Sequence, residues 1–176
     1  MILLKASFEG SFFLMEYTEN NGTAEGIENV ENKKHDDTEK LLRECNAGIK
    51  MGISSIDEVL PSVHDSRLKE ILERGRREHA DLGDETHELL LQYDCDTKEP
   101  HPVAKSMSWI KTNVMLMVNP SDKTVADLMT DGCNMGVKSL NGYLNEYTLA
   151  DSKAQKITGK LIDIEERMAD SMAEFL

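Results

Sequence analysis

The sequence predicts an all-α protein in which two copies of one helical hairpin form a four-helix bundle. Apolar residues recur at spacings of three and four along four long segments, which places them on one stripe of each helix. No segment shows the sustained alternation of apolar and polar residues that a strand requires. The phrase Cys-Asn-x-Gly, followed by a β-branched residue and Lys, occurs twice, starting at Cys45 and at Cys133.

The first hairpin is predicted from residue 37 to residue 93. Its first helix covers 37–61 and ends near Pro61. Asp65 and Ser66 then supply N-cap chemistry for a second helix over 66–93, because short polar side chains satisfy the free N–H groups of a first turn.

The second hairpin is predicted from residue 122 to the C-terminus. Ser121 and Asp122 open a helix over 122–148, and Asp151 with the serine after it opens the last helix over 152–175. Between the hairpins, an amphipathic stretch predicts a connecting helix over 102–118 that stops before Pro120, since the residue before a proline is biased away from the helix. A connection this long lets the third helix start at the end of the bundle opposite to where the second finishes.

The match between the two hairpins extends beyond the repeated Cys-Asn-x-Gly motif. Cys45 and Cys133 are separated by 88 residues, and Asp65 and Asp151 by 86. With the second offset, His79 in the second helix corresponds to Glu165 in the fourth. The whole helix-turn-helix unit is therefore duplicated.

The N-terminal segment differs in composition from the rest. Residues 1–35 are predicted to form a disordered tail before a bundle over 36–176, because residues 16–35 are polar and offer little to bury. Met15 is an alternative start, which would leave residues 1–14 outside the working protein. Lys5 and Glu9 interrupt the first apolar run, which argues against a signal peptide.

Charge and cysteine usage restrict the function. The chain has 33 acidic and 20 basic side chains, a formal net charge of −13, so its surface would repel nucleic acid and anionic lipid. The three cysteines have no Cys-x-x-Cys spacing, which favours a reducing cytoplasm over a disulfide framework. We therefore expect a cytoplasmic protein that binds neither nucleic acid nor membranes.

The duplicated hairpin, the long crossover and the phrase LLRECNAGIKMGISSIDEVLPSVHDSRLKEILERGRREHADLGDE resemble the ferritin-like superfamily, in particular its small bacterial members of unknown function. The resemblance covers residues 38–176 and implies a ferritin-like four-helix bundle. Di-iron members use Glu-x-x-His motifs, and this sequence has none. We therefore expect a non-enzymatic protein, either stress-related or an interaction module. A metal-binding protein with redox or metal-handling activity is the alternative that the resemblance implies.

Four residues capable of binding metal fall within the apolar stripes. Helical spacing places Cys45, Cys133, His79 and Glu165 inward, within a turn of one another if each hairpin closes tightly. Zinc accepts these ligand types, and iron is the metal of the resembling family. A hydrogen-bonded His79–Glu165 pair among buried thiols explains the same pattern without any metal. This structural interpretation is the one we favour over a metal site or a catalytic role, and no cofactor is predicted.

Two further expectations concern packing. Gly48, Gly52 and Gly136 lie inside predicted helices, where glycine costs about 1 kcal/mol relative to alanine, so close packing is expected to require them. The connecting helix carries apolar residues on more than one face, among them Trp109, Met115 and Met117. Core contact is the simpler explanation, and a homodimer interface is the alternative.

Overall fold

The computed structural model describes residues 24–93 and 121–176, which are almost entirely helical and contain no strand. Four helices make up this part of the chain: α2 (Ala24–Val59), α3 (Ser66–Gln92), α5 (Asp122–Glu146) and α6 (Ser152–Met172). Short 3-10 turns follow α2 at Leu60–Ser62 and α6 at Ala173–Phe175. Among these described helices, none has the length and apolar character needed to cross a membrane.

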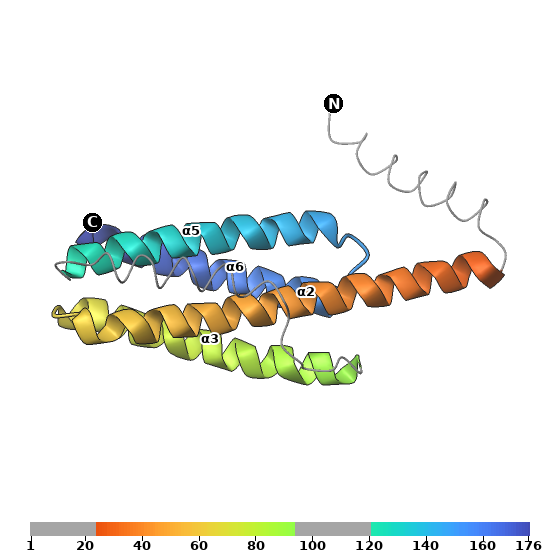
Figure 1. Ribbon diagram of the computed structural model, residues 1–176, viewed down its shortest axis with the longest axis horizontal. Coiled ribbons are helices and arrows are strands. Elements are labelled where there is room, and N and C mark those ends of the chain that lie inside the picture. The colour runs from red at the N-terminus through yellow and green to blue at the C-terminus, as the bar shows by residue number, and fades with distance from the viewer. Residues whose placement is uncertain (1–23, 94–120) are drawn as a thin grey trace, which may run out of the picture.

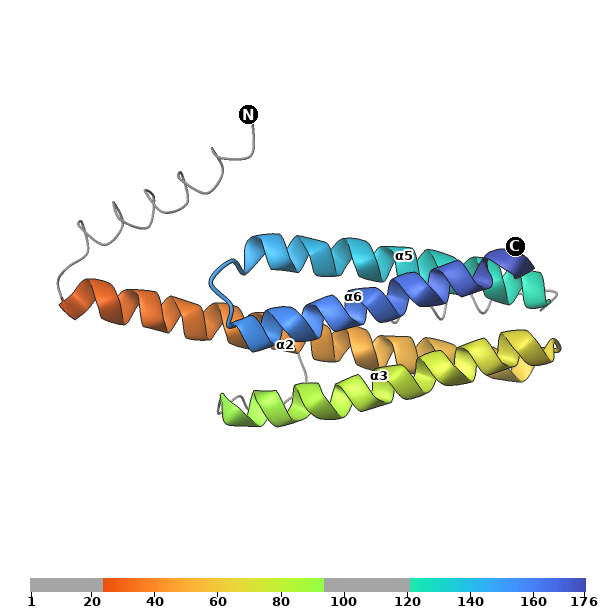
Figure 2. The ribbon, with the colours of Figure 1, turned by 180° about the vertical axis from the view of Figure 1, so that it is seen from behind.

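The helices form two antiparallel hairpins that lie side by side (Figure 1). α2 packs against α3, α5 and α6, and α6 also packs against α3 and α5. The reverse view in Figure 2 shows α6 running between α5 and α3. The predicted all-helical fold with four long helices is confirmed.

The predicted helix starts of α3, α5 and α6 are confirmed, and each has its expected cap. The Asp65 carboxylate accepts the backbone N–H groups two and three residues on, at 2.7 and 3.2 Å. The Asp151 carboxylate accepts the N–H two residues on at 2.8 Å, and the Ser121 hydroxyl the N–H three residues on at 3.2 Å. These bonds satisfy N–H groups that have no partner inside their own helix.

Each hairpin turn is held by a residue from the first helix of the other hairpin. Asp122, at the start of α5, accepts the backbone N–H groups of residues 64 and 65 at 2.7 and 3.2 Å. Asp37, in α2, accepts the N–H of residue 149 in the α5–α6 turn at 3.1 Å. α5 therefore begins where α3 begins, at the end of the bundle opposite to where α3 finishes. The predicted crossover helix over 102–118 lies outside the described residues.

α2 begins at Ala24 rather than near residue 37, so the prediction of disorder is wrong for residues 24–35. Starting a helix is costly, but extending one that is already fixed adds a hydrogen bond for each residue ordered. The bundle fixes α2 at Asp37 and at Thr38, whose hydroxyl accepts the N–H of Asp151 at 2.8 Å. The polar residues before this point then continue the helix outward (Figure 1). The rest of the predicted tail, residues 1–23, lies outside the described part of the chain.

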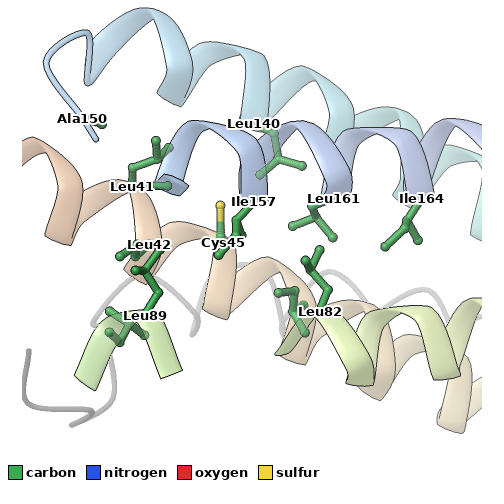
Figure 3. Packing of buried hydrophobic residues seen from close by; sticks show 13 residues of the cluster. Leu41, Leu42, Cys45, Leu82, Leu89, Leu140, Ala150, Ile157, Leu161 and Ile164 are labelled. Atoms are coloured by element: carbon green, nitrogen blue, oxygen red, sulfur yellow. The ribbon is translucent and has the colours of Figure 1, made fainter. Parts of the chain in front are cut away.

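The core consists of two apolar clusters. The first lies towards the α5–α6 turn, where leucine and isoleucine side chains from all four helices meet around Cys45 (Figure 3). The second lies towards the α2–α3 turn and contains Met129, Cys133, Met168 and Met172. The candidate site lies where the two clusters meet.

Candidate functional site: a buried polar layer

One residue from each helix interrupts the apolar core at the same level. On every helix, residues of the first cluster flank this position on one side and residues of the second flank it on the other. We call the four residues the polar layer: Gly52 on α2, His79 on α3, Gly136 on α5 and Glu165 on α6. His79 is completely buried and Glu165 is 8% exposed.

The two polar side chains of the layer are bonded to each other. His79 Nε2 lies 3.2 Å from Glu165 Oε1, and His79 Nδ1 lies 2.7 Å from the carbonyl oxygen of Gly75, one turn earlier on α3. Both nitrogens of the ring are thus used. The predicted His79–Glu165 hydrogen bond is confirmed.

The glycines of the layer make room for this pair. A Cβ atom on Gly52 would lie 2.6 Å from His79 Nε2, and one on Gly136 would lie 3.3 Å from Glu165 Cδ. The expectation that close packing requires glycine is confirmed for Gly52, and at Gly136 a side chain would press on Glu165 more closely than an ordinary contact. A Cβ atom on Gly48 would meet only Leu161, at an ordinary 3.5 Å, so the same expectation is wrong for Gly48.

The electrostatics favour a charged imidazole. Burial lowers the pKa of His79, but the hydrogen bond and the negative charge of Glu165, together with the Gly75 carbonyl, outweigh burial and raise that pKa above its ordinary value. Histidine beside a carboxylate in a site of low polarity is stabilised as the imidazolium. The raised pKa of His79 favours the ion-paired form of this buried pair over the form with a neutral ring.

Cys133 lies next to the polar layer. Burial raises the pKa of its thiol, and the charge of Glu165 and a hydrogen bond with that carboxylate raise it further. Only the thiolate is strongly nucleophilic or binds metal well. Cys133 therefore stays protonated near neutral pH.

Cys45 does not join this group, and its predicted place in the same layer is wrong. Its Sγ lies 3.1 Å from the hydroxyl of Thr158, inside the first apolar cluster. His79 lies against Gly52, whereas a tightly closed hairpin predicts Gly48 at this level. Cys45 is thus seven residues from the layer along α2, roughly 10 Å at the rise of an α-helix. Burial raises the pKa of Cys45 to about 11, although the bond with Thr158 lowers it in part.

The geometry leaves few free groups with which to bind a metal. Within the described ranges, no three His, Cys, Asp or Glu side chains are arranged to hold a metal ion. Among buried side-chain nitrogen and oxygen atoms in the same ranges, only Thr130 Oγ1 lacks a hydrogen-bond partner. Glu165 and His79 are bonded to neighbours within the protein.

Some features of the site were not expected from the sequence. Thr158, the partner of Cys45, was not singled out, although a threonine within the apolar stripe of α6 is a visible signal. The carbonyl of Gly75 as a second partner of His79 was also missed. A histidine four residues after a glycine in a helix is a weak signal for such a bond.

Comparison with known proteins adds no assignment. Protein-family models, curated proteins and solved structures each give no match to this chain. The function must be inferred from the composition and the geometry described above.

Proposed function

We propose that this chain is a non-enzymatic helical module, built as a ferritin-like bundle, that acts by binding another macromolecule rather than by converting a substrate. The observation that carries the proposal is the self-contained polar layer. Both ring nitrogens of His79 are hydrogen-bonded, one to Gly75 and one to Glu165, and the backbone at Gly52 and Gly136 lies close against the pair. Such a layer fixes how helices align, and it has no reactive group positioned to meet a substrate.

The ferritin-like arrangement is supported by the repeated hairpin and by the position of the helix ends. Asp65 and Asp151 are equivalent in the repeat, and both are N-caps. α3 ends and α5 begins at opposite ends of the bundle, as a long crossover requires. The same proposal keeps the protein in a reducing cytoplasm, in line with two buried free cysteines, Cys45 and Cys133. With a net charge of −13, electrostatic attraction favours a positively charged protein partner over nucleic acid.

The proposal includes a homodimer interface in the segment between α3 and α5. Trp109, Met115 and Met117 lie outside the described residues, and the predicted homodimer interface around them stays a prediction. Measuring the mass of the full chain in solution, with and without Trp109→Ala, would test it.

The alternative is a metal-handling protein. It draws support from the chemistry of His79, Glu165 and Cys133, which are side-chain types that zinc accepts, although the three are not arranged to hold an ion. A metal would have to displace the proton shared by His79 and Glu165 and ionise a thiol whose pKa is raised. We therefore place it second.

Elemental analysis of the full chain, purified without added metal, tests the proposal. We expect well under one equivalent of zinc or iron, unchanged in His79→Gln. His87→Gln serves as the matched control, since His87 is an exposed histidine on the same helix. One equivalent of zinc that disappears in His79→Gln but not in His87→Gln would establish the alternative. Two iron atoms per chain, with consumption of oxygen, would overturn the proposal outright.

A further inference from the structure

The surroundings of His79 fix how many protons its ring must carry. Nδ1 faces the carbonyl oxygen of Gly75 at 2.7 Å, and a carbonyl can only accept a hydrogen bond. Nε2 faces Glu165 Oε1 at 3.2 Å, and an ionised carboxylate can also only accept. Both bonds form together when the ring has two N–H groups, as the imidazolium.

A neutral ring cannot satisfy both partners once Glu165 is ionised. With its proton on Nδ1, the ring turns the lone pair of Nε2 towards the carboxylate. With its proton on Nε2, it turns the lone pair of Nδ1 towards the Gly75 carbonyl. In either tautomer one buried hydrogen bond is replaced by two acceptors facing each other, and an unmade buried bond is costly. The ring has little room to move, because Gly52 lies against its Nε2–Cδ2 edge.

Other titratable groups around the ring do not compensate for this loss. Glu78, on α3 itself, adds negative charge, and Cys133 on α5 is neutral because its pKa is raised. α6 contributes Glu165, and α2 contributes Gly52, which carries no charge. Arg74 and Arg167 line the cavity beside Gly75, and Arg167 pairs with Glu78 at 3.4 Å. Neither arginine is among the groups that shift the pKa of His79.

Solvent can reach the edge of the pair. The side chain of Glu165 is 11% exposed. A cavity of about 290 Å³ between α3 and α6 is lined by Gly75, which binds the ring, and by Met168, next to Glu165 on α6. Protons can therefore exchange with the pair without complete unfolding.

We infer that His79 and Glu165 form a pH-sensitive latch between the two hairpins, which holds α3 against α6 while the ring is an imidazolium and loosens when the ring loses its proton. The pKa of His79 is raised above its ordinary 6.5. The stabilisation is therefore fully present below pH 6.5 and is lost as the pH rises through the higher pKa of the folded state. For each pH unit by which the pKa of His79 in the folded protein exceeds 6.5, the loss of the proton at high pH increases the unfolding equilibrium constant by up to about tenfold.

Glu165→Gln is the informative variant. A carboxamide can donate to Nε2, so a neutral ring with its proton on Nδ1 would keep both hydrogen bonds without any charge. We expect the unfolding constant of the wild-type chain to rise between pH 6 and pH 8.5 relative to that of Glu165→Gln. The other histidines are present in both proteins, so their contributions cancel in this comparison.

Glu85→Gln is the matched control. Glu85 also joins α3 to α6, through an exposed ion pair with Lys160 at 2.6 Å. Removing it is expected to leave the pH dependence the same as in the wild type. NMR of the wild-type ring provides a second measurement that does not depend on any variant folding: His79 should titrate above pH 6.5 and show both ring protons below its pKa. Parallel stability curves for wild type and Glu165→Gln, or a ring that is neutral throughout the folded range, would overturn the latch.

Discussion

Replacing His79 and Glu165 by leucine, singly and together, tests whether the two side chains are coupled. His79→Leu would leave the carboxylate of Glu165, whose side chain is 11% exposed, without a cation or a donor from α3. Breaking a buried ion pair in this way typically costs about 3–5 kcal/mol. The cost has an upper limit, because the stranded group can take up a proton. An ordinary glutamic acid has a pKa of about 4.3, so keeping one protonated at pH 7 costs about 3.7 kcal/mol.

The opposite single replacement should cost less. Glu165→Leu leaves a histidine that can become neutral near pH 7 with little penalty, and its Nδ1–H can still donate to Gly75. Only Nε2 loses its partner, at about 1–3 kcal/mol for an unsatisfied buried group. The double variant has no stranded polar group, so it should recover most of the loss of His79→Leu.

Equilibrium unfolding in urea, followed by circular dichroism, measures all four proteins. We expect His79→Leu to be the least stable of the four proteins at pH 7. The stability that it loses relative to the wild-type chain should shrink by up to about 1.4 kcal/mol for each pH unit below pH 7, because the carboxylate of Glu165 is then protonated more easily. Losses that add in the double variant would refute the reasoning, because they would mean that the two side chains act independently.

Two more predictions follow from the packing. Gly52→Ala would place a methyl group 2.6 Å from a nitrogen of the buried imidazole ring, so it should lower stability by about 1–3 kcal/mol. Gly142→Ala has nothing within 4 Å of the new methyl group and should raise stability by up to about 1 kcal/mol. Thermal unfolding that ranks the two variants in the opposite order would contradict this prediction. The third cysteine of the chain, Cys95, is replaced by serine so that only Cys45 and Cys133 can react. In this background Cys45, with a pKa of about 11, and the buried Cys133 should react with a thiol reagent at pH 8 only as fast as the protein opens. Rapid modification of the native protein would show that these thiols are accessible or activated.

The elements that the sequence predicted well are those with local signals. α3, α5 and α6 start at their predicted residues, because an aspartate or serine cap and an apolar stripe are both readable within one or two turns. The start of α2 had no such signal. Residues 24–35 have a composition typical of a tail, and they are helical as an extension of a helix that the other hairpin holds at Asp37. That contact joins residues more than a hundred positions apart, which no local pattern records.

The candidate site was predicted in part for the same reason. Helical spacing shows that His79, Glu165, Cys45 and Cys133 point inward, but the level of each along the bundle depends on how the turn is built. His79 lies beside Gly52, one helical turn along α2 from the Gly48 that a tight turn predicts. Cys45 was therefore placed in the wrong layer, although its burial was predicted correctly.

The repeat that the sequence predicts is the reason why His79 could be paired with Glu165 before the structure was considered. If an approximate two-fold axis relates the hairpins, two equivalent residues can touch each other only when both lie close to that axis. Identical side chains would be costly there: two carboxylates would repel each other, and two imidazoles would not form an ion pair. A single chain that carries both hairpins can place different residues at the two positions. A histidine facing a glutamate satisfies both groups, so at this buried position the two different side chains are matched to each other.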